Sequence, residues 1–293
     1  MRYFLENEAL KVEIDSFGAE VKSVINKANN REYMWYGNPK FWGRTSPVLF
    51  PFVGSVKNKK YRYKGKTYPM GQHGFARDNE HTLLEQTDTR LTFSFCSSEK
   101  TREVFPFDFE LQCGYELVGN ELKVIWKVIN PSDDVLYFSV GAHPAFLCPV
   151  NGEKDKCGYK LYFEGINEVV HHGNTPAGMA IMDNEILPLD NGRVSITSDF
   201  FDKCTYMIEN NQTGLVGIET PEGNRIVDVK FNTPLFAIWS PEKKNAPFIC
   251  IEPWYGRCDR EDFDGEINER DYTNTLESKG CFEGGYSMVF HKV

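Results

Sequence analysis

The sequence has no long apolar run. No window of about 18 residues is continuously apolar, so we expect no transmembrane helix. The opening stretch, MRYFLENEALKVEID, has charges spread through it and lacks the apolar centre of a secretory signal. We therefore expect a cytoplasmic protein without a membrane segment.

The sequence also lacks the short spacings that hold metals and nucleotides. It contains no HExxH, no CxxC pair, no EF-hand loop, no P-loop, no GxGxxG and no GxSxG. We therefore expect neither a metal nor a cofactor. The eight cysteines are scattered and most lie in apolar runs, such as Cys250 in FICIEPW, so we expect reduced, buried thiols. They are Cys96, Cys113, Cys148, Cys157, Cys204, Cys250, Cys258 and Cys281.

The chain has no excess of positive charge. Its 33 basic and 42 acidic residues give a formal net charge of −9. Nucleic acid is therefore not an expected partner, because binding to phosphate backbones requires a cationic face. A neutral, polar small molecule fits such a surface better, and we expect a monomer or a homodimer.

Aromatic residues and period-two alternation are abundant. Aromatics make up 14% of the chain, and segments such as 90–95 (RLTFSF) and 109–117 (FELQCGYEL) alternate apolar and polar residues. The Gly119-Asn120 pair predicts a hairpin turn. Helical patterns are restricted to 97–105 and 267–278. Further strands are predicted at 9–14, 121–130, 159–165, 193–199, 205–210, 214–220, 225–231, 235–240, 248–253 and 286–293. This spacing predicts an all-β sandwich or barrel, with a single domain over 1–293.

Four irregular stretches interrupt this rhythm, at 35–58, 69–80, 141–158 and 252–265. Loops carried by a rigid sheet often hold binding and catalytic groups. These four stretches also contain most of the unusual residues of the chain, which makes them the first place to look for a site.

Two titratable residues lie at strand ends. His143 ends VLYFSVGAHP, where Gly141 permits tight backbone geometry and Pro144 is expected to stop the ladder. The simpler interpretation is a hydrogen-bonded histidine that closes a turn. Glu252 ends the apolar run FICIE, where a carboxylate is costly to bury unless it is paired or has a chemical role. A salt bridge to a nearby arginine is the alternative.

Further polar and aromatic residues lie in the irregular stretches. GQHGFARD supplies His73 and Arg77, and FWGRTSPVLFPFVGS supplies Arg44 beside Trp42. Arginine next to aromatic rings can bind a hydroxyl, a carboxylate or a phosphate. An ion pair that joins two loops is equally consistent with the sequence.

Together these residue types suit proton transfer on a sugar. Tryptophans such as Trp42 and Trp254 can stack on the C–H face of a pyranose. Asp202 offers another carboxylate before a strand, where a solvated turn is the simpler interpretation. Aspartate, arginine and histidine side chains bind sugar hydroxyls.

The segments GAHPAF, IEPWYGRCD, HGFARD and FWGRTSPVLFPFVGS resemble those of the aldose 1-epimerase (galactose mutarotase) superfamily, most closely its LacX-like branch. The resemblance runs over nearly the whole chain. It implies a large antiparallel β-sandwich, the galactose mutarotase-like supersandwich, and an isomerase of carbohydrate metabolism that interconverts hexose anomers without metal or cofactor.

The resemblance also implies roles for individual residues. His143 matches the general acid of the family and Glu252 its general base. Substrate-binding positions match His73, Arg77 and Arg44, and Asp202 is a looser match to a sugar-binding carboxylate.

Two departures from the family leave alternatives open. Classical galactose mutarotases have a tyrosine and an asparagine after the acid histidine, whereas this chain has HPAFL. HGFAR is shared with the hexose-6-phosphate mutarotases, so the substrate is a free hexose or a hexose phosphate. Glycoside hydrolysis by Glu252 and Asp202 is a second enzyme hypothesis. A non-catalytic carbohydrate-binding or sugar-sensing protein is a third, and an intact His143–Glu252 pair argues against it.

Overall fold

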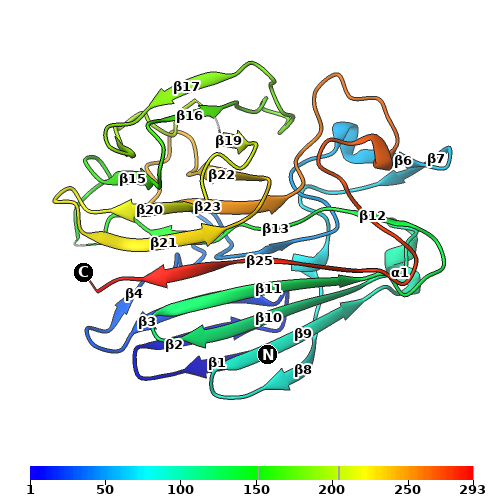
Figure 1. Cartoon of the computed structure of the whole chain (residues 1–293), viewed down its shortest axis with the longest axis horizontal. Coiled ribbons are helices and arrows are strands. Elements are labelled where there is room, and N and C mark those ends of the chain that lie inside the picture. The colour runs from blue at the N-terminus through cyan, green and yellow to red at the C-terminus, as the bar shows by residue number, and fades with distance from the viewer. Residues whose placement is uncertain (151, 204, 293) are drawn as a thin grey trace.

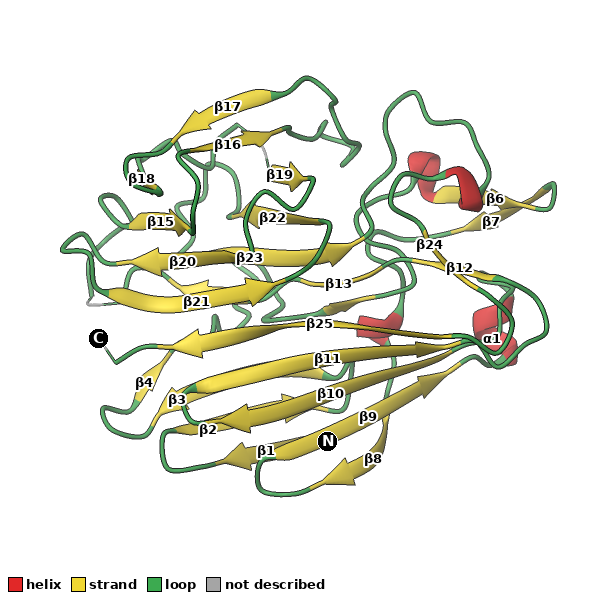
Figure 2. Cartoon of the chain, viewed as in Figure 1, coloured by secondary structure: helices red, strands yellow, loops and turns green. Residues whose placement is uncertain are grey.

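The fold is built almost entirely from antiparallel strands (Figures 1 and 2). The computed structural model describes residues 1–150, 152–203 and 205–292. A nine-stranded sheet forms one layer. In spatial order its strands are β18 (Arg193–Ser195), β15 (Lys160–Phe163), β20 (Leu215–Glu219), β21 (Arg225–Phe231), β25 (Cys281–Phe290), β11 (Glu121–Ile129), β10 (Glu110–Val118), β9 (Arg90–Cys96) and β8 (Thr82–Gln86).

Two further sheets face this layer. The six-stranded sheet contains β19 (Tyr206–Glu209), β22 (Leu235–Trp239), β23 (Phe248–Tyr255), β13 (Val140–Ala142) and β5 (Val48–Leu49), and β14 (Ala145–Leu147) also pairs with β23. The four-stranded sheet contains β1 (Arg2–Glu6), β2 (Leu10–Asp15), β3 (Glu20–Asn26) and β4 (Arg31–Glu32). Three two-stranded ribbons complete the sheets of the described residues: β6 (Lys60–Tyr63) with β7 (Lys66–Pro69), β12 (Leu136–Phe138) with β24 (Asn274–Leu276), and β16 (Glu168–His171) with β17 (Glu185–Pro188).

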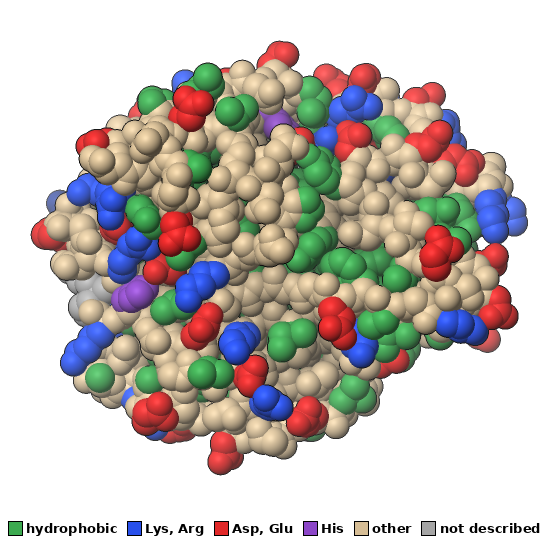
Figure 3. Space-filling model, in the orientation of Figure 1, with side chains coloured by type: hydrophobic (Ala, Val, Ile, Leu, Met, Phe, Trp, Pro, Cys, Tyr) green, Lys and Arg blue, Asp and Glu red, His purple; other side chains and the backbone are tan. Residues whose placement is uncertain are grey.

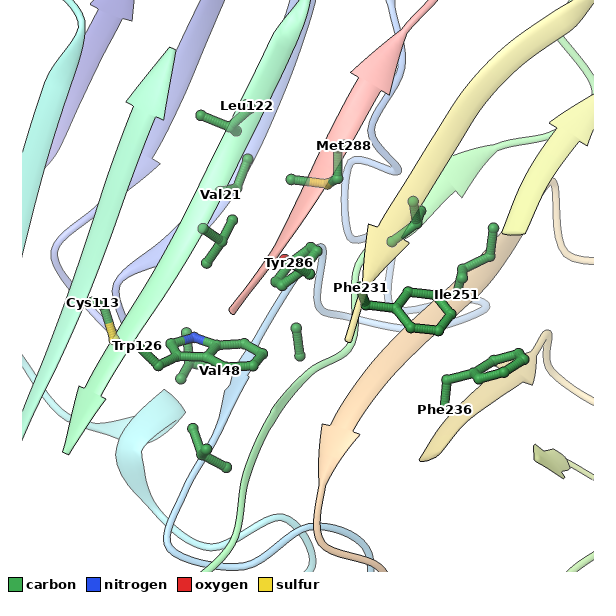
Figure 4. Close-up of a cluster of buried hydrophobic side chains, with 14 of the residues drawn as sticks. Val21, Val48, Cys113, Leu122, Trp126, Phe231, Phe236, Ile251, Tyr286 and Met288 are labelled. Atoms are coloured by element: carbon green, nitrogen blue, oxygen red, sulfur yellow. The ribbon is translucent and has the colours of Figure 1, made fainter. Parts of the chain in front are cut away.

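The alternating pattern explains how the two layers meet. Along β10, buried residues alternate with half-buried ones, and β11 repeats the pattern after the predicted turn at Gly119-Asn120. Figure 4 shows the resulting core, in which Trp126, Tyr286 and Phe231 of the nine-stranded sheet lie between the layers. Phe236 of β22 and Ile251 of β23 approach from the other side. The predicted all-β sandwich is confirmed.

Helices are few and short, as predicted. They are α1 (Glu99–Arg102), η1 (Lys57–Lys59), η2 (Ala76–Asp78) and η3 (Ile267–Glu269). The predicted helical segment 267–278 is helical only in its first turn, because its end pairs as β24 with β12. No helix among the described residues has the length and apolar character that a membrane crossing requires.

Two local predictions need correction. The irregular stretch predicted from residue 252 begins later, because β23 continues through Pro253, which lies opposite Phe236, to Tyr255. The cysteines are also less uniform than expected. All those described are free thiols, but only four of them are buried. The buried ones are Cys113, Cys148, Cys250 and Cys258, the exposed ones are Cys96, Cys157 and Cys281, and Cys204 lies outside the described residues, as does Val293 of the predicted last strand.

Candidate active site

A cavity of about 390 Å³ opens on the face of the six-stranded sheet that points away from the sandwich core. Successive side chains of β23 point to opposite faces of the sheet, one toward the core and the next toward the cavity. Ile249 and Ile251 point into the core, whereas Glu252 and Trp254 line the cavity. Of the predicted site residues, six contribute to its wall: Trp42, His73, Arg77, His143, Glu252 and Trp254.

His143 and Glu252 are brought together by strand register. Gly141 lies opposite Trp254 and Ala145 lies opposite Cys250, so the residues between them place His143 opposite Glu252. Pro144 interrupts the pairing only briefly, because β14 resumes it immediately. The His143 Nε2 and Glu252 Oε2 atoms are 3.2 Å apart, and the Glu252 side chain is only 1% exposed.

This pair is poorly supplied with other polar partners. Glu252 Oε2 and His143 Nδ1 are both buried and have no hydrogen-bond partner among the described residues. Unsatisfied buried polar atoms are uncommon in folded proteins, and each one calls for an explanation such as a catalytic role or a bound ligand. The predicted alternative of a salt bridge between Glu252 and an arginine is not what the described residues form, since the titratable neighbour of this carboxyl is His143.

Burial determines the protonation of the pair. It raises the pKa of the Glu252 carboxyl well above its usual value. It also lowers the pKa of His143 to about 3, and the positive charges of Arg77 and Arg44 act in the same direction. In the ligand-free protein burial therefore favours a protonated carboxyl beside a neutral imidazole. Moving that one proton across the 3.2 Å contact gives carboxylate and imidazolium without changing the charge of the pair.

Tryptophans hold the imidazole on two sides. The Trp42 ring stacks on the His143 ring with centroids 4.6 Å apart, and Trp239 meets it edge-on at 5.2 Å. Trp254 is fixed by its indole N–H, which donates to the Ala142 carbonyl at 3.2 Å. Gly141 makes room for this ring, because a Cβ there would lie 2.7 Å from Trp254 Cδ1.

His73 lies on a loop whose backbone is unusual. The residue has a φ of +65°, and the following Gly74 could not carry a side chain because a Cβ would lie 2.3 Å from the Phe50 carbonyl oxygen. The Gly54 N–H donates to His73 Nδ1 at 3.1 Å, which leaves the proton of the neutral ring on Nε2. Burial lowers the pKa of His73 well below its usual value, so the ring supplies a neutral N–H donor to the cavity.

Arg77 is the basic side chain among the described wall residues. Its Nη2 donates to the Gln72 carbonyl at 2.8 Å, while its buried Nε has no hydrogen-bond partner in the described part of the chain. Burial, together with the charge of Arg44, lowers the pKa of Arg77 to about 10. The guanidinium is therefore still charged at neutral pH, and its Nε–H has no hydrogen-bond acceptor among the described residues.

Arg44 and Asp202 are not brought to the cavity wall as the structure describes it. Arg44 binds Asp78 at 2.7 Å and lines a neighbouring hollow, which shares Trp42 and Arg77 with the cavity. Asp202 accepts a hydrogen bond from the Lys243 backbone N–H at 2.9 Å and so anchors the loop after β22. Arg44 matches the ion-pair alternative that its sequence context left open, whereas Asp202 is half-buried and joins two loops rather than lying in a simple solvated turn.

The cavity also has wall residues that were not predicted from the sequence, namely Gln72, Asn174, Thr205, Trp239 and Glu242. Gln72 directly precedes His73, and Trp239 ends the strand beside β23, so both could have been found by extending the motifs. Asn174 lies in a segment without any recognisable local pattern, and Thr205 begins the predicted strand 205–210, which carries no motif that marks a site. Only the fold brings them to the site.

The comparisons with known proteins agree with this architecture. The family model for aldose 1-epimerase matches residues 1–267. The chain belongs to the aldose 1-epimerase family. The chromosomal LacX protein of Lactococcus lactis is 29% identical over 262 residues, which cover 86% of this chain and 87% of that protein.

Two solved structures are similar to this family member over essentially their full lengths. A galactose mutarotase related enzyme from Lactobacillus acidophilus shares 35% identity with a TM-score of 0.94, covering 100% of this chain and 98% of its own. A galactose mutarotase-like protein from Lactobacillus casei shares 29% identity with a TM-score of 0.91, covering 99% and 100%. The galactose mutarotase-like sandwich is therefore the fold of this aldose 1-epimerase family member.

Proposed function

We propose that this protein interconverts the α and β anomers of a free aldohexose, with Glu252 as general base and His143 as general acid. The observation that carries the proposal is the 3.2 Å contact between the two side chains in the wall of a cavity. The ring oxygen and the anomeric hydroxyl of a pyranose are bonded to the same carbon. An acid and a base that act on both must therefore be neighbours.

The reaction then needs only proton transfers. Glu252 accepts the proton of the anomeric hydroxyl while His143 donates one to the ring oxygen, and the bond between C1 and the ring oxygen breaks. Rotation about the C1–C2 bond presents the other face of the aldehyde. The two transfers reverse as the ring closes, so the protein ends in its starting protonation state. A well-placed acid or base of this kind contributes about 10²–10⁴ in rate.

The remaining wall residues suit a sugar. His73 and Arg77 offer donors for hydroxyl oxygens, and Gln72, Asn174 and Thr205 offer neutral polar groups. Trp42 and Trp239, which contact each other and His143, offer apolar surface beside the pair.

The charge of the wall favours a free hexose over a hexose phosphate. Glu242 also lines the cavity, so the positive charge of Arg77 is offset among the described wall residues. A phosphate dianion would lie in the same cavity as that carboxylate. The second arginine of the motif, Arg44, is already paired with Asp78 in the neighbouring hollow.

Glycoside hydrolysis has less support. It requires two carboxyl groups at one sugar, about 5–10 Å apart. Asp202, the second carboxylate of that hypothesis, is bound to the Lys243 backbone, and the histidine beside Glu252 would have no role.

The deciding experiment follows the optical rotation of freshly dissolved α-D-glucose and α-D-galactose. We expect the wild type to accelerate equilibration, and we expect His143→Asn and Glu252→Gln each to lose about 10²–10⁴ of that acceleration. His81→Asn is the matched control, because His81 is a buried histidine that does not line the cavity. Its activity should remain near that of the wild type.

Three outcomes would redirect the proposal. Acceleration with glucose 6-phosphate but not with glucose would assign the phosphorylated substrate. Sugar binding without acceleration of either anomerisation would favour the carbohydrate-binding alternative. Full activity in both site variants would remove the acid–base assignment.

A further inference from the structure

A third side chain lies next to the His143–Glu252 pair and has no part in the proposed reaction. Cys250 is two positions before Glu252 on β23, so the two side chains point to the same face of the sheet. One ring nitrogen of His143, the Cys250 Sγ and one Glu252 carboxylate oxygen all lie within 4.8 Å of one another. All three side chains are buried.

These three groups have the character of a metal-binding set. Imidazole, thiolate and carboxylate are the ligands that Zn²⁺ uses in proteins, and a tetrahedral ion would place them about 3.3–3.8 Å apart. Small side-chain rotations bring atoms within 4.8 Å to that spacing. Glu252 Oε2 is buried without a hydrogen-bond partner in the described residues, and His143 Nε2, 3.2 Å from it, carries the lone pair of the neutral ring when the ring proton is on Nδ1.

We propose that His143, Cys250 and Glu252 bind a thiophilic divalent cation, with Zn²⁺ as the best fit, and that this cation inhibits the enzyme. One thiolate and one carboxylate neutralise the two charges of the ion, which makes the buried complex neutral overall. Binding releases the thiol proton and the carboxyl proton to solvent. The thiolate disfavours Mg²⁺ and Ca²⁺, which prefer oxygen ligands.

The ion would inhibit the enzyme because it occupies lone pairs of His143 and Glu252 that the proposed reaction uses. Glu252 cannot accept a proton through an oxygen that coordinates the metal, and a coordinated His143 has lost the mobile proton of the pair. The cavity provides the entry path, since it is lined by both His143 and Glu252. The inhibition part of this inference rests on the proposed mutarotase function, but the binding part does not.

Binding is tested with Co²⁺, which substitutes for Zn²⁺ and reports a thiolate ligand by an intense near-ultraviolet charge-transfer band. We expect this band in the wild type and in Cys113→Ala, a control that removes another fully buried strand cysteine far from the trio in sequence. We expect no such band in Cys250→Ala. If Cys250→Ala does not fold, Cys250→Ser keeps the side-chain size and removes the thiolate. Absence of the band in the wild type, or its persistence without Cys250, overturns the site.

Inhibition is tested by titrating Zn²⁺ into the anomerisation assay. The wild type should be inhibited reversibly, with recovery on addition of EDTA. Cys250→Ala should retain activity and require at least about tenfold more Zn²⁺ for half-inhibition. Equal sensitivity of the two proteins overturns the inhibition. If the wild type has no anomerisation activity, the Co²⁺ band still decides the binding site, so the two failures are distinguishable.

Discussion

At the scale of single residues, the central feature is that His143 and Glu252 share one mobile proton. Burial lowers the pKa of the imidazole to about 3 and raises that of the carboxyl well above its usual value. Below the lowered pKa of His143 both groups are protonated, so the pair carries one additional proton. Above the raised pKa of Glu252 both groups have lost it, so the shared proton is gone. Between these limits the proton count is constant.

This constancy predicts the pH profile of the reaction. An ordinary histidine acid would lose its proton near pH 6.5 and an ordinary glutamate base would gain one near pH 4.3, so activity would change through this range. Here we expect kcat/KM for α-D-glucose to show no histidine titration step near pH 6.5, because burial lowers the pKa of His143 to about 3 in the free enzyme. The measurement is polarimetry at low sugar concentration with the buffer-catalysed rate subtracted. A titration step near pH 6.5 would contradict it.

The charges of two arginines also affect the pKa of His143. Arg77 and Arg44 both lower the pKa of His143, although only Arg77 lines the cavity. The positive field therefore favours the neutral imidazole in the empty site. It also favours transfer of the imidazolium proton to the ring oxygen once a sugar is bound.

At the scale of elements, the geometry of the proposed acid–base pair depends on β13 and β14, two short strands that both pair with β23. Both strands pair with β23, one before and one after the His143-Pro144 step. The backbone on each side of His143 is therefore fixed by the same partner strand that carries Glu252. Closeness of the two side chains is a property of register rather than of loop conformation.

Gly141 offers a direct test of this support. An alanine there would place its Cβ 2.7 Å from Trp254 Cδ1 and 3.2 Å from the Pro253 carbonyl oxygen. We expect Gly141→Ala to lower the free energy of unfolding by about 1–3 kcal/mol, since the strand or the indole must move. Urea unfolding measures the change, and the anomerisation rate should fall as well.

The matched control is Gly71→Ala. A Cβ at Gly71 would have no heavy atom of another segment within 4 Å, so an added methyl group meets open space. The free energy of unfolding of this variant should stay within about 0.5 kcal/mol of the wild type. Equal stability of Gly141→Ala and Gly71→Ala would show that β13 tolerates displacement.

Elements also explain what could be predicted from the sequence. Long strands such as β10 and β11 were predicted because apolar and polar residues alternate along them, which indicates the face of the sheet that each residue occupies. The pairs β13 with β5 and β12 with β24 are two or three residues long, which is too short to show an alternating pattern. They are recognised as strands only by their pairing in the structure. Likewise, His73 and Arg77 share one recognisable motif. Asn174 and Thr205 reach the cavity from separate segments, and no site motif marks either of them.

At the scale of the whole molecule, charge is dispersed. On the face shown in Figure 3, blue Lys and Arg side chains are interspersed with red Asp and Glu side chains. The chain as a whole is acidic, with a formal net charge of −9. A neutral sugar approaches such a surface without electrostatic steering, whereas an anionic substrate would be repelled at long range.

Salt dependence distinguishes these cases. For α-D-glucose we expect kcat/KM to change by less than about twofold between about 0.05 and 0.5 M NaCl, because screening does not act on an uncharged substrate. The assay is the same polarimetric one at constant pH. A strong change of kcat/KM with added salt for this uncharged sugar would contradict the expectation.

The arrangement of the cavity separates two kinds of residue. His143 and Glu252 are held by paired strands, whereas Gln72, Asn174 and Glu242 come from connecting segments. Connections tolerate insertions and exchanges that strands in register do not. On the proposed function, exchange of connecting segments would therefore change the sugar preference while the His143–Glu252 pair is kept. A panel of loop chimeras on this scaffold would share one reaction and differ in the sugar they accept.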